Sequence, residues 1–251
     1  MDAFFSSGAI SGFVLLSFPH ILALAVVLLL ILGLFHTRIA IRNHPRLRRT
    51  IRYGLALLLL LSEASLNIWY LSQNIWDARY TLPLELCSLT LLLSIIMLLT
   101  RSRWLYPFLF LAGIAGALQA LITPNLSYEF PHFRYFQFFI SHAAIILASL
   151  YMTWIEGYKL SWKSVAWAML LLNISAAAVW GVDYAIGANY MFLAHKPDTA
   201  SLLNLLGPYP YYLLAEEGIA LLMFIILYIF FFLLPDKITQ HNHSRKGARS
   251  S

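Results

Sequence analysis

Apolar stretches about as long as membrane-crossing helices recur along the whole chain of 251 residues. A helix needs roughly 20 mostly apolar residues to cross a hydrocarbon core of about 30 Å. The pattern therefore predicts an all-α, polytopic membrane protein with seven transmembrane helices in one domain, residues 1–235. The predicted helices are His20–Phe35, Ile51–Ser72, Leu82–Thr100, Trp104–Ile122, Arg134–Ile155, Trp162–Val182 and Tyr209–Leu234.

Polar residues interrupt this pattern for longest in the sixth connection, from Asp183 to Pro208. Asp198 is suited to cap a short helix over Thr199–Leu206, and Gly207 is suited to end it. We expect this short helix to lie over the outer mouth of the bundle. Most other connections are short, which favours antiparallel neighbours in a compact bundle.

Basic residues set the predicted orientation. A run of arginines from Arg38 to Arg52 borders the first helix, as a stop-transfer cluster on the cytoplasmic side does. With the N-terminus outside and the C-terminus in the cytoplasm, only Arg79, Arg134 and Lys196 of the 17 Lys and Arg residues lie outside. Residues 236–251 are polar and basic, which predicts a disordered cytoplasmic tail able to touch anionic lipid.

Composition agrees with this class of protein. The chain is 61% hydrophobic and 11% charged, and its mean hydropathy is +0.74, far outside the balance of soluble domains. The formal charge of +6 does not indicate nucleic-acid binding, because the basic residues border apolar helices instead of forming a soluble patch. Cys87 is the only cysteine, so no internal disulfide can form.

Strongly polar side chains in the predicted helices share one depth. Counting 1.5 Å of rise per residue places them about 6 to 15 Å below the outer ends, whereas the inner halves carry no amide, imidazole or carboxylate. An ionisable side chain in hydrocarbon costs about 2.5 kcal/mol or more, so a shared cavity that opens outward is the economical explanation. The layer consists of Asn67, Cys87, Gln119, His142, Glu216, Glu63 and Asn173.

A thiol and an imidazole at similar depth are the ingredients of nucleophilic acyl transfer. In this hypothesis Cys87 attacks an ester carbonyl, His142 moves the proton, and a carboxylate, Glu216 or Glu85, orients the imidazole. Each also has an ordinary interpretation: a thiol in the core, a histidine bonded to a neighbouring helix, and a glutamate at the positive end of a helix dipole. Glu216 and Glu217 point about 100° apart, so at most one faces the cavity squarely.

Two other functions compete with acyl transfer. A zinc-dependent hydrolase could use His132, His142 and His195, but no pair of ligands lies one helical turn apart, so no metal or cofactor is expected. An ion-coupled or small-solute transporter could use the intramembrane carboxylates of Glu63 and Glu216, although the inner half offers no second polar layer.

The chain also contains five motifs in a fixed order: Leu82-Pro83-Leu84-Glu85-Leu86-Cys87-Ser88, Gln119-Ala120-Leu121-Ile122-Thr123-Pro124, Phe130-Pro131-His132-Phe133-Arg134, Asn189-Tyr190-Met191-Phe192 with Lys196-Pro197, and Gly207-Pro208-Tyr209-Pro210. Together they resemble the YwaF-type integral membrane proteins of bacteria. That group is similar to the animal transmembrane protein 164 family, described as an acyltransferase that moves polyunsaturated acyl chains onto ether phospholipids through a cysteine. The resemblance implies Cys87 as the nucleophile and His142 as its histidine partner.

The polar layer and the resemblance together define the expected site. We expect Cys87, His142 and Glu216 to be catalytic, with a membrane lipid as substrate and a bacterial plasma membrane as the location. The expected substrate-pocket residues are Glu85, Asn67, Gln119, His132, Arg134, Asn173, His195, Lys196 and Glu217.

Overall fold

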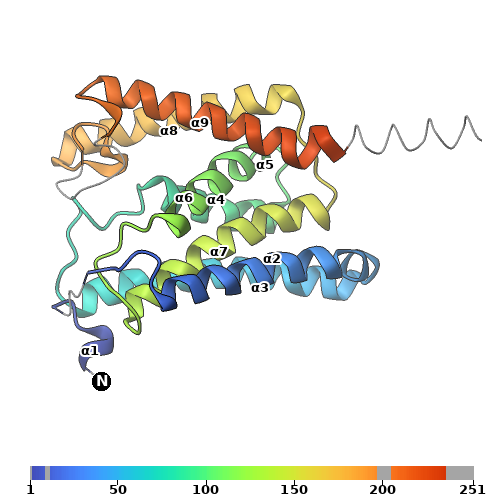
Figure 1. Ribbon diagram of the computed structural model, residues 1–251, viewed down its shortest axis with the longest axis horizontal. Coiled ribbons are helices and arrows are strands. Elements are labelled where there is room, and N and C mark those ends of the chain that lie inside the picture. Colours follow the sequence, from blue (N-terminus) through green and yellow to red (C-terminus); the bar gives the residue numbers. More distant parts are fainter. Residues whose placement is uncertain (1, 9–11, 197–204, 236–251) are drawn as a thin grey trace, which may run out of the picture.

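Helices form all the regular structure in the part of the chain that the computed structural model describes, residues 2–8, 12–196 and 205–235 (Figure 1). The all-α prediction is confirmed. Two elements, η1 and η4, are π-helical, and η2 is a 3₁₀-helix. The elements are α1 (Asp2–Phe5), α2 (Phe18–Asn43), α3 (Pro45–Ser72), α4 (Leu86–Thr100), α5 (Tyr106–Phe108), η1 (Leu109–Gly113), α6 (Ile114–Ile122), α7 (Phe133–Trp154), α8 (Trp162–Ile186), η2 (Tyr190–Phe192), α9 (Tyr211–Tyr228) and η4 (Ile229–Leu233).

Five helices in these ranges are long and apolar enough to cross a membrane: α2, α3, α7, α8 and the continuous helix Tyr211–Leu233. Two further apolar helices, α4 and the run Tyr106–Ile122, are shorter. The chain is therefore a polytopic helical membrane protein. The 15 residues of α4 rise only about 22 Å, less than the thickness of a hydrocarbon core of about 30 Å.

Helix α4 begins four residues later than the apolar pattern suggests, at Leu86 instead of Leu82. A residue before proline is pushed out of helical backbone geometry, and Leu82 precedes Pro83. The Leu82 N–H donates to the Tyr190 hydroxyl at 2.8 Å, and the Leu84 N–H donates to the Leu82 carbonyl at 2.8 Å. This turn moves Cys87 into the first turn of α4.

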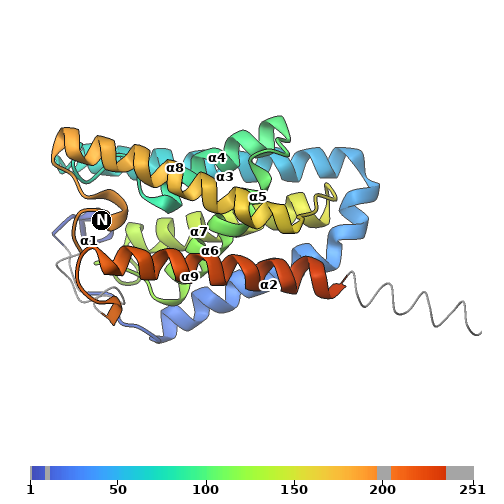
Figure 2. The same ribbon diagram turned by 90° about the horizontal axis from the view of Figure 1, so that it is seen from above.

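Helices α2 and α3 form a V-shaped hairpin joined by a single residue, His44 (Figure 2). Pro45 begins α3, where its missing N–H costs no hydrogen bond. Helix α7 packs against both arms. The first predicted helix was therefore too short at its C-terminal end, because α2 continues to Asn43 through Arg38 and Arg42.

Helix α7 is the centre of the bundle. In its membrane-length window 72% of the residues are buried, against 11% to 28% in the other four long helices. It contacts α2, α3, α4, α6 and η1. In Figure 1 the shorter helices α4, α5 and α6 lie between the pair α8 and α9 and the pair α2 and α3. All the other helices are thus placed around α7 or around its direct neighbours.

Two glycines let the α5–η1–α6 run approach α4 closely. A Cβ atom on Gly113 would lie 3.3 Å from Ile145 Cγ2 and 3.7 Å from Thr90 Cβ, and one on Gly116 would lie 3.7 Å from Cys87 Sγ. Small residues are typical of helix contacts in membranes, where close packing replaces the hydrophobic effect. The glycines therefore fix the position of the first turns of α4.

The sixth connection begins later than the sequence pattern suggests, because α8 continues to Ile186 and ends at Gly187, whose φ is +68°. Gly207 also has a positive φ, +87°, as expected for a residue that ends a helix. The short helix predicted over Thr199–Leu206 falls largely outside the described residues. The predicted tail, residues 236–251, falls wholly outside them.

Filling the space at Gly113 should weaken the bundle. We expect Gly113→Val to lower the free energy of unfolding by about 1 to 3 kcal/mol, because the added methyl groups collide with Ile145 and Thr90. Gly33→Val on α2 is the matched control, since nothing lies within 4 Å of a Cβ there. Thermal melting of the two purified variants in one detergent measures the difference, and equal melting temperatures would contradict the close approach.

Candidate active site

Cys87 lies in the first turn of α4, facing α6. Its side chain is partly exposed, and its sulfur lies against Gly116. Because glycine has no side chain, the sulfur can pack directly against the α6 backbone at this position. A larger residue at position 116 would press on the thiol.

The N-terminus of α4 is not capped by a side chain. Glu85 occupies the N-cap position, but its carboxylate turns away and accepts a hydrogen bond from the Met191 N–H at 3.1 Å. The first N–H groups of any helix lack intrahelical acceptors. The amides of Leu86, Cys87 and Ser88 consequently have no acceptor in the described part of the chain. Free donors and a thiol thus lie in the same helical turn.

The loop at η2 fixes this arrangement. The Tyr190 hydroxyl accepts from Leu82 N–H and donates to the Ala78 carbonyl, both at 2.8 Å. Since Met191 also holds Glu85, two consecutive residues of η2 position the entry to α4. Glu85, which was predicted to line the pocket, links the start of α4 to η2.

His142 is buried near the middle of α7, and its hydrogen bonding defines its tautomer. Its Nδ1 lies 2.7 Å from the Phe138 carbonyl one turn earlier. A carbonyl oxygen only accepts, so Nδ1 carries the proton and Nε2 is left with a lone pair. Among the described residues Nε2 makes no hydrogen bond, either to Cys87 or to Glu216. The imidazole is therefore set up as a base, but the structure does not join it to the thiol.

Three other predicted residues form a separate group between α3 and α7. Asn67 donates to the Glu63 carboxylate at 3.1 Å, one turn away on α3. Arg134 donates to Gln137 and lies over the Trp69 ring, with 5.9 Å between Cζ and the ring centroid. The members of this group supply hydrogen-bond partners to one another, which polar side chains need where lipid offers none.

His132 caps α7 and holds the N-terminal segment. Its Nδ1 accepts from the Arg134 N–H at 3.0 Å, so Nε2 carries the proton and donates to the Ser6 carbonyl at 3.2 Å. The Trp69 indole and the Tyr128 hydroxyl donate to the neighbouring carbonyls of Phe5 and Ser7. The segment containing residues 5–7 is thereby fastened across the ends of α3 and α7.

The remaining predicted residues lie on or near α8 and α9. Asn173 donates to the Glu217 carboxylate at 3.1 Å, whereas Glu216 makes no hydrogen bond within the described residues. Two more lie in the connection between these helices: His195 is held by Asn189, and Lys196 lies 5.4 Å from the Tyr212 ring centroid. Gln119 lies elsewhere, on α6, and is exposed.

The sequence pattern missed Asp183. It was taken as the first residue of a loop, but it lies within α8, and its side chain is buried with neither carboxylate oxygen hydrogen-bonded. The Tyr190 backbone and the Glu85 carboxylate both lie within electrostatic range of it. Gly187 is the signal that could have revealed this, since a glycine typically follows the last turn of a helix.

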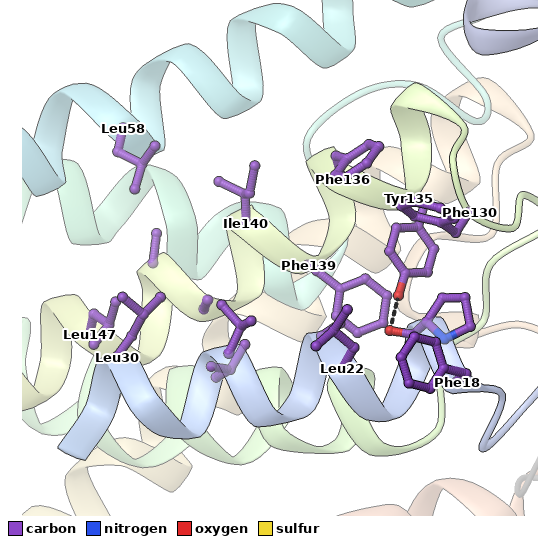
Figure 3. Close-up of a pocket in the computed structure, with 16 residues that line it drawn as sticks. Phe18, Leu22, Leu30, Leu58, Phe130, Tyr135, Phe136, Phe139, Ile140 and Leu147 are labelled. Atoms are coloured by element: carbon purple, nitrogen blue, oxygen red, sulfur yellow. Dashed lines mark hydrogen bonds between the residues drawn. The ribbon is translucent and has the colours of Figure 1, made fainter. Parts of the chain in front are cut away.

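The hydrogen bonds of the predicted polar residues therefore divide them into several groups. The larger described hollow is an apolar groove of about 450 Å³ between α2 and α7, and none of the predicted site residues lines it (Figure 3). The three histidines of the zinc alternative lie in different groups. No set of three or more His, Cys, Asp or Glu side chains in the described ranges could hold a metal ion.

Comparison with known protein families shows to which family this chain belongs. The sequence pattern of the TMEM164 family matches residues 15–228. The chain belongs to the TMEM164 family. The match includes every helix from α2 to α9 and therefore Cys87, His142 and the α4 entry. No curated protein and no solved structure matches the chain.

Membership of the TMEM164 family and the apolar helices agree on a multi-pass membrane protein. The transmembrane protein 164 resemblance found in the motifs is confirmed. In this family member the Cys87 thiol lies beside free amides at the start of α4. The His142 imidazole lies on α7, where a hydrogen bond fixes its tautomer.

Acidification should release the N-terminal segment of this TMEM164 family member. Burial, opposed by the bond to Ser6, lowers the pKa of His132 from its ordinary value of 6.5. A lowered pKa means that the neutral form stabilises the fold, so this stabilisation is present above pH 6.5 and is lost as the pH falls below it. We expect hydrogen exchange at residues 5–7 to accelerate below about pH 6.

His132→Asn is the matched control for this prediction. Asparagine is a favoured N-cap and keeps the bond to the Arg134 N–H, but it does not titrate. Its exchange at residues 5–7 should therefore be independent of pH after correction for the intrinsic exchange rate. The same acid response in both proteins would contradict the role of His132.

Proposed function

We propose that this protein is a membrane-embedded lipid acyltransferase or esterase in which Cys87 is the nucleophile. The observation that carries the proposal is the first turn of α4, where a partly exposed thiol adjoins three amides without acceptors. When the sulfur attacks an ester, negative charge develops on the carbonyl oxygen of the tetrahedral intermediate. This oxyanion needs such donors, and fixed backbone amides supply them at no cost of reorganisation. The activity implied by the family resemblance is of the same kind.

The proposed reaction has two steps. The Cys87 sulfur forms a bond to the ester carbonyl carbon of a donor lipid, and the carbon–oxygen bond to the leaving alcohol breaks. The thiol proton passes to His142 Nε2 and then to that alcohol. In the second step an acceptor hydroxyl attacks the thioester, gives its proton to Nε2, and restores the thiol. Water as the acceptor makes the protein an esterase.

The geometry sets one requirement for this reaction. No hydrogen bond joins Sγ to the imidazole in the structure, so substrate binding must bring the two into contact or bridge them. Glu216 has no bond to His142, and the Nδ1–H is held by the Phe138 carbonyl instead. The proposal therefore rests on Cys87 and His142, with a backbone carbonyl in the orienting role expected for a carboxylate.

The activity can be tested with vesicles that contain a phospholipid with one labelled acyl chain and a lysolipid acceptor. We expect Cys87→Ala to abolish transfer and His142→Gln to lower the rate by about 100-fold or more. The wild type should show a labelled acyl group on Cys87 by intact-protein mass spectrometry. Transfer at the wild-type rate by folded Cys87→Ala protein would refute the proposal.

Access to the thiol has its own control pair. Gly116→Leu should cover Sγ and suppress acylation, because a Cβ there already touches the sulfur. Gly181→Leu on α8 makes the same change where nothing lies within 4 Å of a Cβ. Suppression by both substitutions would point to general destabilisation and away from a blocked thiol.

We further propose that the chain crosses the membrane seven times, with the N-terminus outside and the C-terminus in the cytoplasm. The two shorter apolar helices, α4 and Tyr106–Ile122, supply the crossings beyond the five long ones. The arginine-rich turn around His44 then faces the cytoplasm, as the positive-inside rule requires.

Protease protection in intact cells tests this orientation. A cleavable tag after Ser251 should survive external protease, whereas one between Arg79 and Tyr80 should be cut. The reverse pattern, or cleavage of both tags, would overturn the proposed orientation.

A further inference from the structure

The apolar groove between α2 and α7 is lined by side chains that face each other across the two helices (Figure 3). Leu22, Val26 and Leu30 of α2 lie opposite Phe139 and Ala143 of α7. One lining residue carries a polar group, the Tyr135 hydroxyl, and it is already bonded to the Pro19 carbonyl at 2.7 Å. The wall of this α2/α7 groove is therefore hydrocarbon.

Hydrogen bonds hold α2 at the outer end of the groove and beyond its other end. At the outer end the Tyr135–Pro19 bond is joined by His20, whose Nε2 lies 2.9 Å from the Leu121 carbonyl. Several turns beyond Leu30, the last α2 residue of the groove, Arg42 donates to the Trp154 carbonyl at 2.6 Å. Between these points small side chains such as Ala23, Ala143 and Ala144 leave the interhelical space unfilled.

The groove runs along a length of helix that belongs in the membrane. Its α2 residues extend from Phe18 to Leu30, about 18 Å of helix, within a segment long and apolar enough to cross a bilayer. A void lined by hydrocarbon is not filled by water. An acyl chain is the surrounding molecule with the matching shape and chemistry.

A second, smaller hollow adjoins the outer end of the groove and adds polar groups to it. It has a volume of about 180 Å³ and shares Pro19, Phe130 and Tyr135 with the groove, but it adds Ser17 and Glu129. Within the described ranges, neither the Ser17 hydroxyl nor the Glu129 carboxylate has a hydrogen-bond or ion-pair partner. The polar end therefore offers a negative charge and a free hydroxyl, the complement of a cationic head group.

We propose that the α2/α7 groove binds a phospholipid with an ammonium head group, one acyl chain lying between α2 and α7 and the ammonium pairing with Glu129. This site is separate from Cys87, which faces α6, so it does not depend on the proposed acyl transfer. The bound lipid would act as a wedge that completes the packing of α2 against the central helix. Its specificity would come from the head group and its affinity from the chain.

Native mass spectrometry of the full-length protein tests the site. The protein is delipidated in detergent and then offered phosphatidylethanolamine or phosphatidylglycerol with identical acyl chains. We expect retention of one phosphatidylethanolamine, favoured over phosphatidylglycerol by about threefold, the size that an exposed ion pair supplies. Glu129→Gln should abolish this preference but keep a lipid bound, whereas Asp77→Asn, which removes a carboxylate from another outer loop, should leave the preference unchanged.

Filling the groove tests the chain part of the proposal. Ala143→Leu should reduce lipid retention at least about tenfold, because two or more methylene groups lose their contacts. Ala177→Leu on the exposed face of α8 is the matched control. Ala23→Leu blocks the opposite wall of the groove and replaces Ala143→Leu if that variant does not fold, as judged by its melting curve.

Two results would overturn the proposal. Equal retention by the groove variants and by Ala177→Leu would mean that lipid does not occupy the α2/α7 groove. Equal retention of the two head groups by the wild type would remove the role of Glu129. Neither result bears on acylation of Cys87, so this proposal and the proposed function fail separately.

Discussion

The burial of polar side chains in helix α7 is the constraint on which the rest of the structure depends. A helix that is 72% buried in its membrane-length window cannot hydrate its polar groups with water, and lipid offers no hydrogen bonds. Each polar residue of α7 must therefore find a partner in its own backbone or in a neighbouring helix. Arg134 and Gln137 face α3, Ser149 donates to the η1 carbonyl of Leu109, and His142 turns back to Phe138. These partners determine which helices lie beside α7.

The same constraint explains why the candidate site is built from backbone as much as from side chains. The helical part of α4 rises less than the thickness of a hydrocarbon core, so its first turn and its free amides lie where the protein itself must shield them. The η2 loop supplies that shielding and engages Glu85, and this contact removes the residue that would otherwise cap the helix. Gly116 lets the Cys87 sulfur pack directly against α6. The missing cap and the missing side chain place the thiol beside free amides at the start of α4.

The two proposed lipid contacts lie on different faces of the bundle. The Cys87 thiol lies on the side of α4 that contacts α6, and the α2/α7 groove lies on the side of α7 that faces α2. The hairpin of α2 and α3 produces the groove, because its arms diverge from His44 and α7 packs against both. The proposed acyl transfer and the proposed lipid binding therefore use different residues.

The sequence by itself determined the class of fold, the approximate positions of the long helices and the family. These depend on the number of consecutive apolar residues and on local motifs, which need no knowledge of neighbours. It also singled out the lone thiol and the histidine in the central helix. Asn67 and Glu63 lie one turn apart, so their contact could have been inferred from spacing alone.

Only the tertiary structure decided which polar residues meet. Asn173 and Glu217 are 44 positions apart, and Met191 reaches Glu85 across 106 positions, so these pairs depend on helix order and rotation about each axis. Depth along a helix, which the sequence provides, does not specify direction around it. That is why residues predicted to share one layer separate into several groups, and why Asp183, one residue beyond a predicted helix end, is buried beside the entry to α4.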